Sequence, residues 1–167
     1  MDQTQTPAAA HVNARPAGAV PATTGAPVRF GRAGAIYDLV VTIAFATPLT
    51  ATWMFDLQRW LHVVFGAGGA PVPEFGAVQL MFTSMMGTAV TMWAIARILF
   101  PIAPLIAIDT AGRVAFSAWM IFALASGAST VIVAFLVAEL TWAVLQAIGL
   151  VEQRRASVRR GTAGAAA

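Results

Sequence analysis

Hydrophobic residues form long uninterrupted stretches along this chain, with polar residues gathered between them and at the two ends. Residues 75–96 carry no charged side chain, and residues 114–151 contain a single ionisable group, Glu139. A helix needs about 20 apolar residues to cross the hydrocarbon core of a bilayer. The pattern therefore predicts three membrane-spanning helices in this part of the chain. They cover residues 75–99, 109–126 and 130–150.

A shorter apolar run, residues 33–46, comes first and ends at Thr47-Pro48. Proline lacks a backbone donor and restricts the residue before it, so a helix ends or kinks there. Residues 47–65 then place Trp and Leu side chains at helical spacing, with Thr47 as a possible cap. Two interpretations remain: one kinked helix over residues 33–65, or a short span followed by an interfacial helix. We favour the second, because tryptophan and amphipathic faces suit the headgroup level.

The arginines indicate how these helices are oriented. The chain has ten arginines and no lysine, and four crossings place nine of the ten on the side of both termini. Only Arg59 falls on the opposite side. The positive-inside rule makes the arginine-rich side cytoplasmic, so both termini are expected in the cytoplasm. Three crossings would divide the arginine clusters between the two sides.

The composition supports a membrane protein and excludes several other classes. Of 167 residues, 59% are hydrophobic and 10% are charged, against about 25% charged in a typical soluble domain. The fold class we predict is all-α: a four-helix transmembrane bundle with an amphipathic interfacial segment between the first two spans. Disordered cytoplasmic tails are expected at residues 1–30 and 152–167, around a membrane domain at 31–151. Without cysteine, disulfides and thiolate metal sites are excluded, and the basic excess fits membrane orientation better than nucleic acid.

Glu139 is the first candidate for an intramembrane polar site. It lies about ten residues into the last span, roughly 14 Å deep at 1.5 Å per residue. Placing an acid at this depth costs on the order of 3 kcal/mol. Gln146 shares its face of the helix one heptad later. Two alternatives stay open: a functional carboxyl group, or a neutral one bonded to a threonine or backbone carbonyl of another helix.

Four further charged residues form the second candidate set. Asp109, which could cap the third span, is spaced i, i+4 from Arg113 and can pair with it. Asp38 on the first span could meet Arg97 or Arg113 across the bundle. All four are expected in the cytoplasmic half. We favour ion pairs that fix helix register over a substrate site.

The remaining polar and sulfur-containing residues predict no catalytic residue and no metal site. His62 has no second histidine or cysteine partner near it in the sequence. Met81, Met85 and Met92 form a stripe that is typical of packing rather than of copper binding. Small residues at four-residue spacing in two spans indicate a compact bundle or a homo-oligomer. The cofactor, if there is one, stays unassigned.

The layout resembles the DoxX-like small bacterial membrane proteins. The likeness covers residues 33–151: a short first span ending in FATP, the segment WMFDLQRWLHVVFG, a GAPVP loop and three further spans. It implies a four-helix bundle in a bacterial inner (plasma) membrane, and in some members a quinone-linked or redox-complex partner. The chain departs from the family in having no lysine, and Gly87 stands alone where paired glycines are usual. The resemblance supplies no catalytic residue.

The function predicted from the sequence is a non-enzymatic one. We expect an accessory subunit, or a binder of an apolar small molecule such as a quinone or lipid. The lipid bilayer is the expected surrounding, with a membrane-protein partner or a second copy of the chain as possible partners and no nucleic acid. The alternative is a proton-coupled small transporter or membrane enzyme centred on Glu139.

Overall fold

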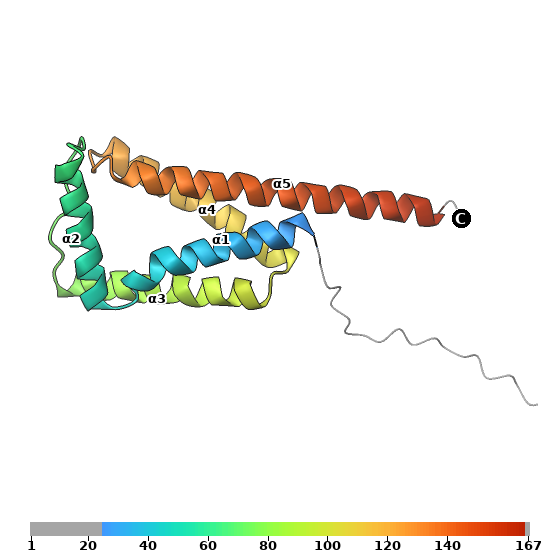
Figure 1. The fold of residues 1–167 in the computed structure, drawn as a ribbon, viewed down its shortest axis with the longest axis horizontal. Coiled ribbons are helices and arrows are strands. Elements are labelled where there is room, and N and C mark those ends of the chain that lie inside the picture. The colour runs from blue at the N-terminus through green and yellow to red at the C-terminus, as the bar shows by residue number, and fades with distance from the viewer. Residues whose placement is uncertain (1–24, 166–167) are drawn as a thin grey trace, which may run out of the picture.

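The computed structural model describes residues 25–165, and this part of the chain is all-helical (Figure 1). It contains five α-helices and one short 3-10 helix, η1, and no strand. The predicted all-α class is therefore confirmed. The elements are α1 (Ala26–Thr42), η1 (Ile43–Phe45), α2 (Pro48–Val64), α3 (Ala77–Leu99), α4 (Ala103–Ala125) and α5 (Ile132–Ala165).

Four of the helices run lengthwise, and α2 stands across one end of them (Figure 1). Helix α1 packs against both α3 and α5, and α5 packs against α4. Although α3 and α4 are consecutive in the chain, they scarcely contact each other along their length. The start of α1 and the end of α5 lie at the same end, opposite α2, and α5 extends beyond the other helices there (Figure 1).

The interior of the bundle is more polar than its surface. Its buried apolar residues are four alanines and Ile106, and the largest fully buried side chains are Arg97, Ile106 and Gln146. Large apolar side chains such as Trp119, Phe122 and Val137 point outward instead. Water disfavours so much exposed apolar surface, whereas hydrocarbon accommodates it. The buried polar and charged residues are Asp38, Ser84, Arg97, Asp109, Arg113, Ser117, Ser129 and Gln146.

This distribution agrees with the lengths of the helices. Helices α3, α4 and α5 are each long and apolar enough to cross a membrane. A fourth crossing is present if α1 and α2 form one broken span. The structure thus supports a membrane protein with three to four helices able to cross the bilayer.

The chain turns sharply between α1 and α2. The two helices are bent by 102° at a break of a few residues. Thr47 caps α2, where its side chain accepts a hydrogen bond from the Thr50 backbone N–H at 3.3 Å, and Pro48 is the first helical residue. Two separate helices are therefore present instead of one kinked helix over residues 33–65, while the interfacial position expected for the second helix stays a prediction.

Three predicted boundaries were wrong. Helix α1 begins at Ala26, inside the tail expected at residues 1–30, while residues 1–24 lie outside the described part. Helix α5 continues to Ala165 through the tail expected at 152–167, where alanine, arginine and glutamine favour a helix. Helix α4 begins six residues before Asp109, because Pro104 suits a first turn and the helix needs no acidic cap. Asp109 is thus an interior helical residue.

The end of the bundle nearest α2 is fastened by loop contacts. His62 Nδ1 lies 2.8 Å from Ser129 Oγ, which ties α2 to the α4–α5 loop. The Ala70 N–H donates to Gly127 O at 2.8 Å, and the Thr130 N–H donates to Gly68 O at 2.9 Å. We call these contacts between residues 62–70 and 127–130 the loop clamp. His62 therefore has a structural partner.

Candidate functional site

Arg113 lies in the middle of α4 and contacts carboxyl groups from three helices. Its Nη2 donates to Asp38 Oδ2 of α1 at 2.6 Å, and its Nη1 donates to Glu139 Oε2 of α5 at 2.9 Å. Its Nε donates to Asp109 Oδ2, one turn earlier on α4, at 3.1 Å. The Arg113 side chain is almost completely buried. Its guanidinium group therefore joins α1, α4 and α5.

Arg97, near the end of α3, joins that helix to the same group of residues. Its Nη2 donates to Asp38 Oδ2 at 2.5 Å, and its Nη1 lies 2.5 Å from Asp109 Oδ2. The second contact is a close ion pair in which the N–H does not point at the oxygen, so Nη1 has no formal hydrogen-bond partner. Asp38 consequently pairs with both arginines, where the sequence offered a choice between them.

Gln146 of α5 completes the cluster on the side of Asp109. Its Nε2 donates to Asp109 Oδ2 at 2.8 Å, and its Oε1 accepts from the Thr110 hydroxyl at 3.0 Å. A Cβ atom at Gly34 would come within 2.9 Å of Gln146 Nε2. Glycine at this position of α1 therefore leaves room for the amide. We call Asp38, Arg97, Asp109, Arg113, Glu139 and Gln146 the charge cluster.

The structure thus brings together all six residues that the sequence singled out. Sequence reasoning placed Glu139 apart from the other charged residues and did not give it an arginine partner. It also missed Trp93, whose Nε1 donates to Asp109 Oδ1 at 3.3 Å, and Thr110. Trp93 precedes Arg97 by one helical turn, and Thr110 follows Asp109 directly. Their closeness in sequence to Arg97 and Asp109 is the signal from which Trp93 and Thr110 could have been predicted.

The cluster is unbalanced in charge. Three carboxyl groups meet two guanidinium groups, so the cluster carries one net negative charge when all five are ionised. Asp38 and Asp109 each contact both arginines, whereas Glu139 contacts Arg113 alone. Glu139 is also the most exposed of the three acids, with 14% of its side chain accessible. It is therefore the least compensated member.

A cavity of about 560 Å³ lies directly on this cluster. All five charged members line it, and they form what we call its charged floor. Apart from Thr42, the rest of the lining is apolar or aromatic, and it comes from α1, α3, α4 and α5. It includes Val41, Met86, Val90, Phe116, Met120 and Phe135.

The cavity opens to the side of the bundle, between α3 and α4. These two helices scarcely contact each other, and the cavity occupies the gap between them. Met86 on α3 is 61% exposed and Phe116 on α4 is 45% exposed, although both line the cavity. A molecule dissolved in the bilayer would therefore reach the charged floor past apolar side chains.

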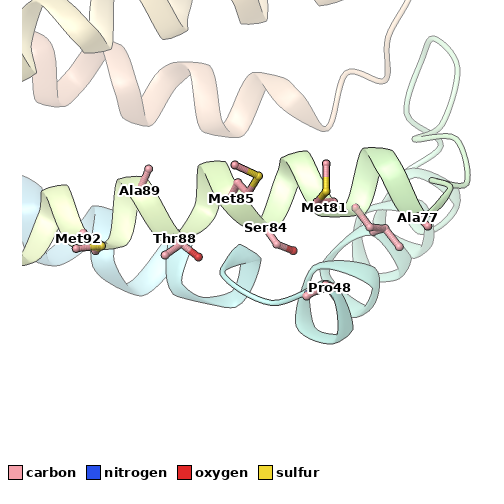
Figure 2. Close-up of a pocket in the computed structure, with 9 residues that line it drawn as sticks. Pro48, Ala77, Met81, Ser84, Met85, Thr88, Ala89 and Met92 are labelled. Atoms are coloured by element: carbon pink, nitrogen blue, oxygen red, sulfur yellow. The ribbon is translucent and has the colours of Figure 1, made fainter.

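A second hollow, of about 680 Å³, lies on the outer surface of α3. Figure 2 shows its lining side chains along α3, with Pro48 of α2 at one edge. Met81, Met85 and Met92 border it and are themselves exposed. No charged residue lines it, and its polar side chains are limited to Ser84 and Thr88, so it offers a mostly apolar surface.

The described residues contain no group of three or more histidine, cysteine or acidic side chains arranged to hold a metal ion. No known protein-family model, curated protein or solved structure matches the chain. The chemistry of the cavity itself is therefore the evidence from which a function can be argued.

Proposed function

We propose that this protein is a non-enzymatic membrane protein that binds a small amphipathic molecule, such as a quinone or a lipid. The observation that carries the proposal is the side-opening cavity with apolar walls and a charged floor. An apolar tail would occupy the walls and extend into the bilayer, while a polar head would meet the charged floor. Ligand sites are commonly apolar clefts with a few convergent polar groups.

The proposed setting is a bacterial inner membrane crossed four times, with both termini cytoplasmic. Residues 26–45 form a helical rod of roughly 30 Å at 1.5 Å per residue, long enough to cross by itself. Arg29 and Arg32 lie in the first half of α1 and Arg154 lies in the second half of α5, whereas Arg59 lies on α2. The start of α1 and the end of α5 are at the end of the bundle opposite α2 (Figure 1). This arrangement supports the cytoplasmic assignment of the arginine-rich end. The DoxX-like resemblance stays a prediction that rests on the same layout.

Filling the cavity tests the proposed function. A Cβ atom at Gly112 meets nothing within 4 Å, and Gly112 lines the cavity, so Gly112→Phe would occupy the space without a clash at Cβ. Ala111→Phe places the same ring on the neighbouring, exposed position of α4 as a matched control. The probe is decyl-ubiquinone, a neutral amphiphile, titrated into purified protein in lipid nanodiscs and followed by tryptophan quenching.

We expect saturable binding to the wild type and to Ala111→Phe, and its loss in Gly112→Phe. Gly112→Leu, with a smaller side chain, should weaken binding if the phenylalanine variant does not fold. Equal binding by all folded variants would contradict the proposal, as would the absence of saturable binding to the wild type. Mass spectrometry of molecules that co-purify in native membranes would then identify the head group, or a partner subunit.

A second candidate function is a proton-coupled transporter or membrane enzyme centred on Glu139. The observation that favours it is the position of the cavity, which lies beside this carboxyl group. Glu139→Gln separates the two candidates. A transporter would lose proton-coupled flux in liposomes while the variant is still inserted normally, whereas a binder would show no flux in either form.

A further inference from the structure

Glu139 has a carboxyl oxygen available to a ligand. Its Oε2 accepts from Arg113, but its Oε1 makes no hydrogen bond within residues 25–165. The side chain is more exposed than those of Asp38 and Asp109 and lines the cavity. The free oxygen of Glu139 therefore faces a space that a ligand can fill.

The charges around Glu139 leave a site for one positive charge. From α1 it is faced by Asp38 and the neutral Tyr37, from α4 by Asp109 and Arg113, and from α3 by Arg97. The two arginines are matched by the two aspartates, with which they form four close pairs. Glu139 is the carboxyl group in excess. Electrical neutrality in a medium of low dielectric then requires a proton or another cation beside it.

Aromatic side chains from four helices line the cavity together with this carboxyl group. Three of them are Tyr37 of α1, Phe116 of α4 and Phe135 of α5. Phe135 lies one helical turn before Glu139, and Phe116 lies about one turn after Arg113. A fourth ring, Trp93, already has the Arg97 guanidinium 5.8 Å from its centroid. Aromatic faces attract organic cations, and more strongly where water is excluded.

We infer that the cavity takes a lipophilic organic cation, such as a hydrophobic quaternary ammonium or phosphonium ion, beside Glu139. This inference rests on the proposed function and adds organic cations to the ligands that the same cavity takes. The cation replaces the proton on the Glu139 carboxyl group, and that proton passes to the solvent, so the charge of the site is unchanged. The hydrophobic substituents lie against Phe116, Phe135 and the apolar wall.

Two ions of the same shape and opposite charge test whether the cavity prefers a positively charged ligand. Tetraphenylphosphonium and tetraphenylborate are each titrated, by equilibrium dialysis, into wild-type protein in nanodiscs made of neutral lipid. We expect saturable binding of the phosphonium ion with release of about one proton per ion, measured in weakly buffered solution. The borate ion should show only the uptake of empty nanodiscs.

Variants of Glu139 test whether its carboxyl group is the one that attracts the cation. Glu139→Gln should weaken phosphonium binding at least about tenfold and abolish proton release. Glu139→Asp keeps the charge and should retain most of the affinity. If Glu139→Gln does not fold, Phe135→Leu provides the second variant: it removes an aromatic face and should weaken binding of the phosphonium ion more than that of the neutral quinone.

The outcomes separate this inference from the proposed function. Binding of decyl-ubiquinone with no preference for the phosphonium ion over the borate ion would overturn the inference and leave the proposed function standing. Equal phosphonium binding by the wild type and a folded Glu139→Gln would also overturn it. Failure of all three probes to bind the wild type would overturn both.

Discussion

Asp38 and Arg113 are 75 positions apart in the sequence, and their Oδ2 and Nη2 atoms lie 2.6 Å apart inside the bundle. This contact joins the first lengthwise helix to the third. The same Asp38 oxygen also accepts from Arg97 of α3 at 2.5 Å. One carboxylate therefore connects three helices.

Replacing Asp38 by asparagine should destabilise the bundle strongly. The substitution keeps the shape of the side chain but removes the carboxylate that pairs with both Arg97 and Arg113, so each of these buried guanidinium groups loses a close ion pair. Removing one partner of a buried pair typically costs about 3–5 kcal/mol. Thermal unfolding in detergent, followed by circular dichroism, measures the change.

The control for this prediction is Asp56→Asn on α2. Asp56 pairs with Arg59 at 2.6 Å, but 60% of its side chain is exposed. Exposed pairs contribute about 0–1 kcal/mol, so this variant should unfold near the wild-type temperature. Equal effects of the two substitutions would contradict a structural role for the charge cluster.

Gly87→Ala should loosen the contact between α3 and the end of the first span. A Cβ atom at Gly87 would lie 2.5 Å from Phe45 C and O, which are backbone atoms and cannot move aside alone. The two segments must separate, so a lower unfolding temperature is expected. Gly112→Ala on α4 meets nothing within 4 Å and should leave stability unchanged or raised. A Gly87→Ala protein as stable as the wild type would show that the close approach is absent.

Gly69→Ala should disrupt the loop clamp. Gly69 has φ +81°, a conformation that L side chains rarely adopt, and a Cβ atom there would lie 2.3 Å from Ala128 O. We expect faster proteolysis of this loop in protein inserted in liposomes. Gly68→Ala is the neighbouring control, because its nearest contact is an ordinary 3.7 Å. Similar cleavage rates for the two variants would argue against the clamp.

Single cysteines provide a test of the four crossings. The chain has no cysteine of its own, so each introduced thiol is the only one that can react. Cysteines at Gly25 and Ser157 should be protected from a membrane-impermeant maleimide in intact spheroplasts and react after lysis. A cysteine at Glu74 should react before lysis. Protection of Gly25→Cys and Glu74→Cys alike would place α1 and α2 in one re-entrant segment and reduce the crossings to three.

Local patterns accounted for much of the fold. The apolar run at residues 75–99 became α3 within two residues of its predicted start, because charge-free length alone defines a spanning helix. The break at Thr47-Pro48 followed from proline chemistry and is present as a cap and a 102° bend. The extension of α5 to Ala165 differs from the expected tail, because a polar composition by itself indicates disorder whereas the alanine, arginine and glutamine of that segment favour a helix.

Which residues meet in the charge cluster depends on how the helices pack, and a local sequence pattern does not determine that packing. The ion pair of Asp109 with Arg113 could be predicted, because i, i+4 spacing fixes it on one helix. The pair of Arg113 with Glu139 depends on how α4 and α5 rotate against each other, and the sequence does not specify that rotation. The cavity depends on the separation of α3 from α4, which results from packing of the whole bundle.

The division of the charged groups among helices has a consequence for biogenesis. Helix α1 contributes a single acid to the charge cluster, α3 a single base and α5 a single acid, while α4 carries an opposite pair of its own. One ionised group raises the free energy of inserting a lone helix into lipid by an amount on the order of 3 kcal/mol. Asp38 is synthesised 59 residues before Arg97, the first base that neutralises it. We therefore expect α1 to stay at the protein-conducting channel until α3 emerges beside it, or to enter the bilayer with Asp38 protonated.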